Sequence, residues 1–67
     1  MNIPGFTTTA LLMLHGTIQA ALTFDDSLPA GREKAYGVRE FRDWRTMSGE
    51  FEQELDKRHV SYEKIAW

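Results

Sequence analysis

The sequence predicts an all-α fold, a two-helix hairpin with a short connecting turn and an apolar extended tail. The first observation is a long apolar segment, Thr7 to Phe24, inside an N-terminal third that has no charged side chain. The second is that all 8 basic and 10 acidic residues lie between Asp25 and Lys64. The third is a helical stripe within that charged remainder. Since a 67-residue chain buries a marginal core and this one has no Cys, a second copy of the chain is the expected source of further stability.

The first helix is expected near Thr8–Phe24. Met1 to Phe6 reads as an extended lead-in because Pro4 restricts the residue before it, and Thr7, Thr8 or Thr9 can supply the N-cap hydroxyl. We expect Asp25 and Asp26 to belong to the following turn, since carboxylates at a helix C-terminus oppose its dipole. One apolar stripe has helical spacing, and three further apolar residues widen it beyond a coiled-coil seam: Leu11, Leu14, Ile18, Ala21 and Leu22, then Leu12, Met13 and Phe24.

The second helix is expected near Val38–Arg58, after a connection in which Ala30–Tyr36 forms one or two helical turns closed by Gly37. Ser48-Gly49 either breaks this helix or lies within it, and continuity is favoured because the apolar stripe keeps its phase. The tail, His59–Trp67, alternates apolar and polar residues. It is therefore expected to pack as an extended segment or a strand. The stripe itself consists of Phe41, Trp44, Met47, Phe51 and Leu55.

Glycine inside the first helix suggests a place where two helices meet. Gly16 and Ala20 share a face, and missing side chains allow backbones to approach closely; tolerance of glycine in a packed helix is an equally good explanation. Two copies are expected to form a four-helix bundle with the first helices at its centre. The candidate self-association residues are Leu11, Leu14, Gly16, Ile18, Ala20, Phe41, Trp44, Met47, Gly49, Phe51 and Leu55. The pattern resembles the ROP-type helical hairpins that dimerise into four-helix bundles, in architecture alone.

Charges on the second helix are segregated about Gly49. Three arginines precede it and four acidic residues follow it, so an antiparallel pair of these helices would place opposite charges side by side; a solvated face with irregular charges is the alternative. The candidate orientation charges are Arg39, Arg42, Arg45, Glu50, Glu52, Glu54 and Asp56.

No chemistry-bearing motif is visible in the chain. His15 and His59 do not form a zinc pattern, and His15 is expected to be hydrogen-bonded or at the edge of the core. No carboxylate lies in an apolar context that suits acid catalysis, and no glycine-rich phosphate loop or zincin pattern occurs. The sequence therefore predicts no catalytic residue, no metal, no cofactor and no enzymatic activity.

The leading functional hypothesis is a cytoplasmic, homodimeric protein-interaction module or small subunit that binds itself and another protein. One alternative is a single-span or membrane-interfacial protein with a cytoplasmic charged helix, since Phe6 to Phe24 is just long enough to span a bilayer. The polar residues within that segment count against this alternative. A second alternative is weak nucleic-acid binding through Arg32–Arg45, where three aromatic residues are interleaved with basic ones. The net charge of -2 makes nucleic acid the less favoured partner.

Overall fold

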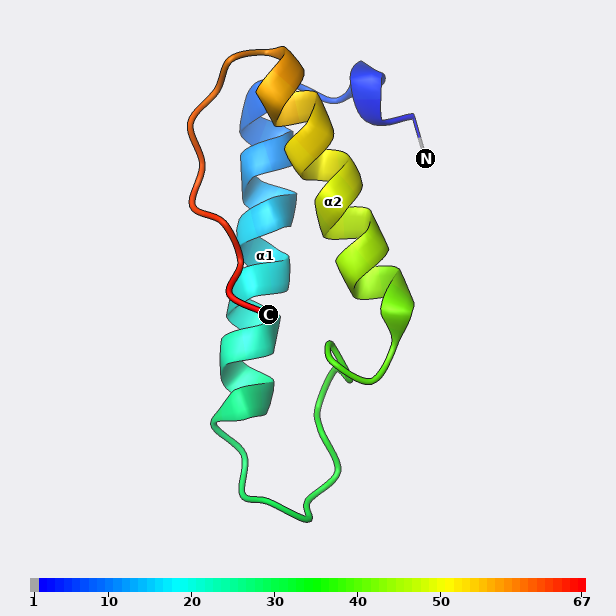
Figure 1. Cartoon of the computed structure of the whole chain (residues 1–67), viewed down its shortest axis with the longest axis vertical. Coiled ribbons are helices and arrows are strands. Elements are labelled where there is room, and N and C mark those ends of the chain that lie inside the picture. The colour runs from blue at the N-terminus through cyan, green and yellow to red at the C-terminus, as the bar shows by residue number, and fades with distance from the viewer. Residues whose placement is uncertain (1) are drawn as a thin grey trace.

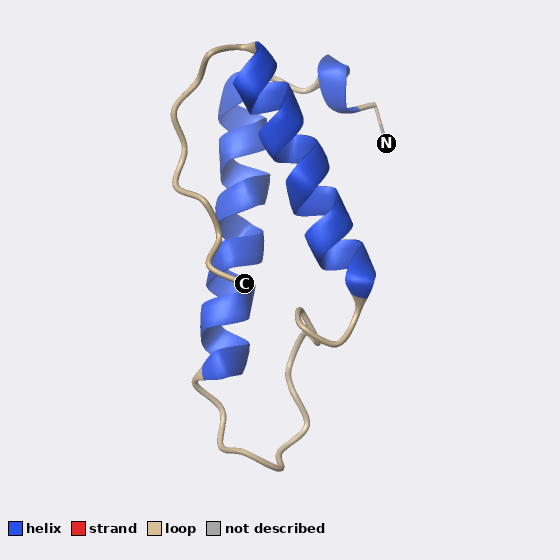
Figure 2. Cartoon of the chain, viewed as in Figure 1, coloured by secondary structure: helices blue, strands red, loops and turns tan. Residues whose placement is uncertain are grey.

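The protein is a two-helix hairpin. The computed structural model describes residues 2–67 and contains, in order, a 3-10 turn η1 (Ile3–Gly5), helix α1 (Thr8–Asp26) and helix α2 (Arg42–Lys57). The two α-helices lie side by side in opposite directions, joined by a long loop, and the tail returns beside α1 (Figures 1 and 2). Residues 2–67 contain no strand, so the predicted all-α fold is confirmed.

Helix α1 begins as predicted and ends later than predicted. Thr7 is the N-cap, and its hydroxyl accepts a hydrogen bond of 3.1 Å from the amide of Ala10. The prediction that Asp25 and Asp26 lie in the turn is wrong, because the helix includes both. The buried Asp25 carboxylate accepts hydrogen bonds from the amides of Tyr36 and Val38, at 3.0 and 3.1 Å. These donors offset the unfavourable position of a carboxylate at the helix C-terminus.

The loop differs from the predicted connection. The predicted helical turns in Ala30–Tyr36 are absent, and this stretch forms bends and a turn. Helix α2 was expected to start near Val38 but starts at Arg42. The amide of Val38 is already bound to Asp25. A tight turn follows, in which the Gly37 carbonyl accepts the amides of Glu40 and Phe41. Gly37 has a φ of 70°, a conformation that glycine adopts at little cost.

Helix α2 is continuous across Ser48-Gly49, as favoured by the sequence. Ser48 is buried, and its hydroxyl donates to the Arg45 carbonyl at 3.0 Å. The helix closes with His59 at a positive φ of 56°, which places the Val60 amide on the Leu55 carbonyl and the His59 amide on the Asp56 carbonyl. This pair of hydrogen bonds is the Schellman motif, here with a histidine where glycine is usual.

The core lies between the two helices and is completed by both ends of the chain. Ile3 of η1 is buried, so the N-terminal segment forms a turn against α2 where an extended lead-in was predicted. The tail is an extended segment and not a strand, the first of the two predicted possibilities, with Ile65 buried and Val60, Tyr62 and Trp67 partly buried against the core. The buried apolar residues are Ile3, Leu11, Ile18, Ala21, Leu22, Val38, Phe51, Leu55 and Ile65.

Candidate functional site

The side of α1 that faces away from the core is exposed and uncharged. We call it the outer face of α1; it consists of Thr9, Leu12, Met13, Gly16, Thr17, Ala20, Thr23 and Phe24, all exposed. Met13 is 62% exposed and Phe24 50%. An exposed helix face ordinarily carries charged and polar residues opposite the core stripe. This face instead combines large apolar side chains with small and hydroxyl-bearing ones.

The middle of the outer face is formed by the small residues Gly16 and Ala20. A Cβ atom added at Gly16 would meet no atom within 4 Å, so the hairpin itself does not require glycine there. A shallow hollow adjoins Gly16 and continues toward the end of the helix along Ala20, Thr23 and Phe24. Glycine costs about 1 kcal/mol relative to alanine within a helix, so this position is unexplained by contacts inside one chain.

An aromatic cluster extends the outer face toward the loop. The rings of Phe24 and Tyr36 meet edge to face with centroids 5.9 Å apart, and Tyr36 meets Trp44 in the same way at 6.5 Å. Beside them lies a small groove of about 250 Å³, also lined by Thr17 and Ala20. The outer face therefore continues across the start of α2 without a charged side chain among the residues that line this groove.

The predicted self-association residues divide into three groups. Gly16, Ala20 and Phe41 are exposed, and Gly49 is partly buried. Leu14, Trp44 and Met47 are partly buried against the core, while Leu11, Ile18, Phe51 and Leu55 are buried within the hairpin. The buried group holds one chain together and lies on no surface. Phe41, expected in the core stripe, is 64% exposed because it precedes α2 as its N-cap.

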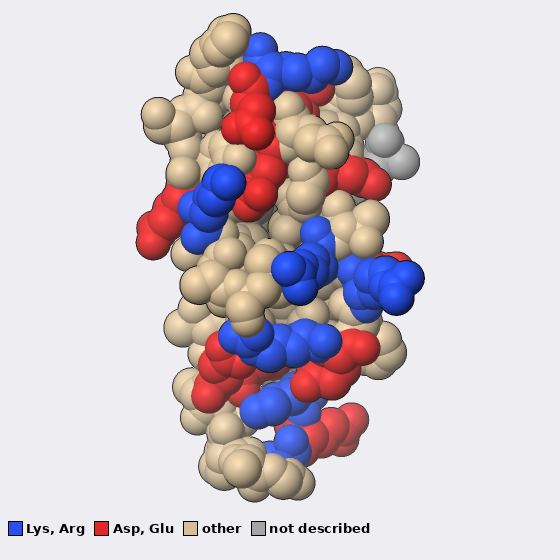
Figure 3. All heavy atoms as spheres, viewed as in Figure 1, with Lys and Arg blue, Asp and Glu red and all other residues tan. Residues whose placement is uncertain are grey.

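Most of the predicted orientation charges contact groups of their own chain. Arg39 lies in the loop and pairs with Asp26 at 2.9 Å, and it also donates to the carbonyl of Trp67. Glu54 pairs with Arg58 at 2.8 Å. Arg45 lies over the Trp67 ring, 5.5 Å from its centroid. Figure 3 shows the mixture of basic and acidic side chains over the face in view. The outer face of α1, by its sequence, has no charged side chain.

A polar network around the buried His15 joins both helices to the tail. His15 is 3% exposed, and its Nε2 lies 2.9 Å from Oε2 of Glu52. The ring of Tyr62 meets the His15 ring edge to face at 5.3 Å, and the Tyr62 hydroxyl donates to Asp56 at 3.0 Å. Burial, followed by this hydrogen bond, raises the pKa of Tyr62 to about 12. The expected hydrogen-bonded role of His15 is confirmed, although its partner on α2 was not foreseen.

The contacts of this network indicate that it stabilises the fold and does not form a ligand site. Within residues 2–67 every buried side-chain nitrogen and oxygen has a hydrogen-bond partner, so no unsatisfied group points toward a ligand. The same described residues contain no group of three side chains able to hold a metal ion. His15 and Glu52 are 37 positions apart, and no spacing in the sequence indicates their contact.

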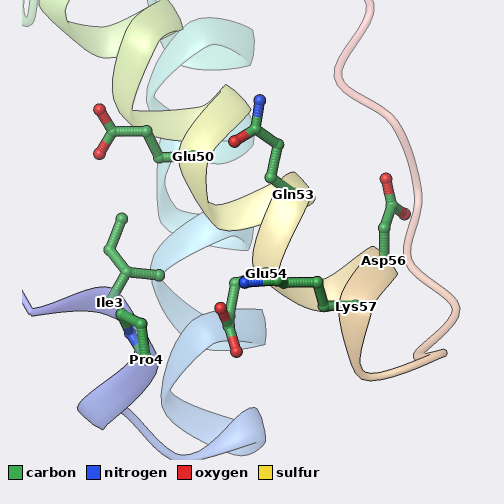
Figure 4. A pocket seen from close by; sticks show the side chains of 7 residues that line it. All are labelled: Ile3, Pro4, Glu50, Gln53, Glu54, Asp56 and Lys57. Atoms are coloured by element: carbon green, nitrogen blue, oxygen red, sulfur yellow. The ribbon is translucent and has the colours of Figure 1, made fainter.

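An open groove lies between η1 and α2. It has a volume of about 710 Å³ and is lined by Ile3, Pro4, Glu50, Gln53, Glu54, Asp56 and Lys57. Figure 4 shows Ile3 and Pro4 on the turn across from the α2 side chains. The Glu54 carboxylate accepts a hydrogen bond from Arg58, and the Asp56 carboxylate accepts one from the Tyr62 hydroxyl. Two carboxylates that line this groove therefore already have partners within the chain.

The outer face of α1 is thus an uncharged surface with large apolar side chains that the folding of residues 2–67 leaves exposed. The sequence predicted Gly16 and Ala20 as self-association residues and placed Leu12, Met13 and Phe24 in a widened apolar stripe, and all five are exposed. The lack of charge around the whole helix is the signal in the sequence for this face. Among residues 2–67, neither helix has the length and hydropathy required to cross a bilayer. Comparisons of the chain with models of protein families, with curated proteins and with solved structures give no match.

Proposed function

We propose that this protein is a small, non-enzymatic interaction protein that self-associates through the outer face of α1. Two hairpins joined in this way form a four-helix bundle, with the two α1 helices at the centre and the charged α2 helices outside. The proposal rests above all on one observation, the exposed helix face on which every residue from Thr9 to Phe24 is uncharged.

The energetic reason is desolvation. Burying a charged side chain at an interface costs several kcal/mol unless a partner compensates it, whereas the burial of apolar area favours association. The outer face offers Met13 and Phe24, each at least half exposed, and no charge to desolvate. The outward residues of α2 include Arg42, Glu50 and Lys57, which suit contact with water.

A matched pair of glycine substitutions tests the proposal. A Cβ atom is unobstructed in the hairpin at both Gly16 and Gly49, so alanine at either position is expected to raise the stability of the single chain by up to about 1 kcal/mol. Only Gly16 lies on the outer face. Gly16→Ala is expected to weaken self-association, and Gly16→Leu to abolish it, while Gly49→Ala leaves it unchanged.

Sedimentation velocity over a range of concentrations measures the association, and urea unfolding at low concentration measures the stability. A wild-type chain that remains monomeric at high concentration contradicts the proposal. So does a dimer that Gly16→Leu leaves intact, since the outer face would then lie outside the interface. Retained stability of Gly16→Leu shows that any loss of the dimer does not come from unfolding.

A further inference from the structure

We infer that the partner of the outer face is a second α1 in antiparallel orientation, related by a two-fold axis that passes beside residue 18. This inference rests on the proposed self-association and specifies its geometry. In that arrangement Gly16 of one copy lies against Ala20 of the other. Leu12 and Met13 of each copy contact Phe24 of its partner.

The distribution of side-chain size along the outer face supports this register. The two smallest residues, Gly16 and Ala20, lie two positions on either side of residue 18. The large exposed residues lie farther out, Leu12 and Met13 on one side and Phe24 on the other, five or six positions away. An antiparallel pair with this centre therefore brings small residues together at the crossing and large ones together at both ends. A methionine sulfur against an aromatic ring is also a favourable contact.

A parallel pair would also place residues of similar size together, with Gly16 beside Gly16 and Phe24 beside Phe24. It would, however, align the two helix dipoles in the same direction and bring together the two helix ends that carry Asp26. The antiparallel contact is isologous, so it uses the same surface twice and closes after two copies, as most small homodimers do.

The charges at the two ends of α1 favour the same orientation. The helix has no acidic residue in its first turn and ends on Asp25 and Asp26 with no basic residue in its last turn, so its own dipole is not offset by its side chains. Arg58 lies at the N-terminal end, where it donates to the Thr8 hydroxyl at 3.2 Å. Antiparallel pairing brings this positive end of one copy toward Asp26 of the other. Since Arg58 and Asp26 already have partners within the chain, these charges set orientation more than affinity.

Distances between spin labels on two single-cysteine variants test the geometry. The chain has no cysteine, so Thr9→Cys and Ser27→Cys each place one label on an exposed site at opposite ends of the outer face, outside the apolar contacts. Both sites are nine positions from residue 18. With a rise of 1.5 Å per residue, the two labels in an antiparallel dimer are roughly 27 Å apart along the helix axis for either variant.

Pulsed dipolar spectroscopy on each labelled dimer distinguishes the possible outcomes. Similar long separations at both sites, lost in both variants when Gly16→Leu is added, are the expected result. Short contacts at both sites indicate a parallel dimer and overturn the orientation while leaving the proposed function standing. Clearly unequal separations overturn the register about residue 18. An absence of dipolar coupling between chains, with sedimentation showing a monomer, overturns the proposed function itself.

Discussion

At the scale of single residues, the least favourable backbone position in the hairpin is His59. Its φ of 56° is the only positive value outside glycine among residues 2–67. A left-handed conformation costs an L-residue roughly 1–2 kcal/mol, and histidine tolerates it better than most side chains. The fold accepts this cost because the position ends α2 and turns the chain into the tail, with the Val60 amide bound to Leu55 at 3.0 Å.

Replacing this histidine with glycine is therefore expected to stabilise the protein. His59→Gly removes the steric cost and keeps the hydrogen bonds of the helix end, so the free energy of unfolding should rise by about 1 kcal/mol. Chemical denaturation of the purified chain measures the change. His59→Ala is the control, because alanine retains a Cβ atom in the same conformation and should give no gain. Equal effects of glycine and alanine would show that the backbone conformation is not the cause.

At the scale of the elements, Asp25 determines where the loop ends and α2 begins. Its carboxylate is buried, and it binds the amides of Tyr36 and Val38. Burial acts to raise the pKa of Asp25, but these backbone hydrogen bonds outweigh it, so the pKa lies below its ordinary value of 3.8. The charged form is thus the one that the native structure binds.

The sign of the resulting pH dependence follows from linkage. A carboxyl group with a depressed native pKa contributes stability above its unfolded pKa, and this contribution is lost as the pH falls below that value. Asp25→Asn is expected to lower stability at neutral pH and to reduce the further loss below about pH 4. Asp26→Asn is the control. Its carboxyl pKa is also lowered, chiefly by Arg39, but that pair is well exposed and contributes less. Urea unfolding at several pH values distinguishes them, and parallel curves for wild type and Asp25→Asn would contradict the assignment.

The sequence alone predicted that the two helices exist but not where they meet the loop. Helical spacing was sufficient for both helices and for the continuity of α2 through Gly49, because periodicity is a local property. The later end of α1 and the later start of α2 depend on Asp25 meeting amides 11 and 13 positions away. No local pattern indicates such a contact. Phe41 continues the stripe in phase but precedes the helix. The prediction that it lies in the core stripe is therefore wrong for the same reason, the later start of α2.

For the candidate surface, the sequence indicated which residues are small but not which way they face. Gly16 and Ala20 were identified by spacing and are exposed. The charge-free composition of Thr7 to Phe24 predicted more apolar surface than one partner helix covers, and the exposed Met13 and Phe24 are that surplus. Distinguishing these exposed residues from the buried Leu11 and Ile18 requires knowing where α2 lies, and that position depends on tertiary contacts.

At the scale of the whole molecule, the two helices alone do not complete the fold. The tail covers His15 with Tyr62 and buries Ile65, and Trp67 lies under Arg45. At the other end of the chain, Arg58 joins α2 to the N-terminal segment by donating to the Pro4 carbonyl at 3.2 Å. The tail therefore occupies one side of α1 and α2 another, and this arrangement is what leaves the outer face as the remaining surface of the central helix.

Tyr62 provides a measure of how firmly the tail is held. Its pKa is raised from 10.0 to about 12, by burial and by the hydrogen bond to Asp56. A raised native pKa means that the neutral phenol contributes stability below pH 10, and that this contribution is lost as the pH rises from 10 to 12. Tyr62→Phe keeps a ring against His15 and removes the titrating hydroxyl. It should therefore unfold with less dependence on pH across this range than wild type. The exposed Tyr36 supplies the control, since Tyr36→Phe should retain the wild-type alkaline loss. If Tyr62→Phe also retains it, the tail is not held against the helices through this hydroxyl.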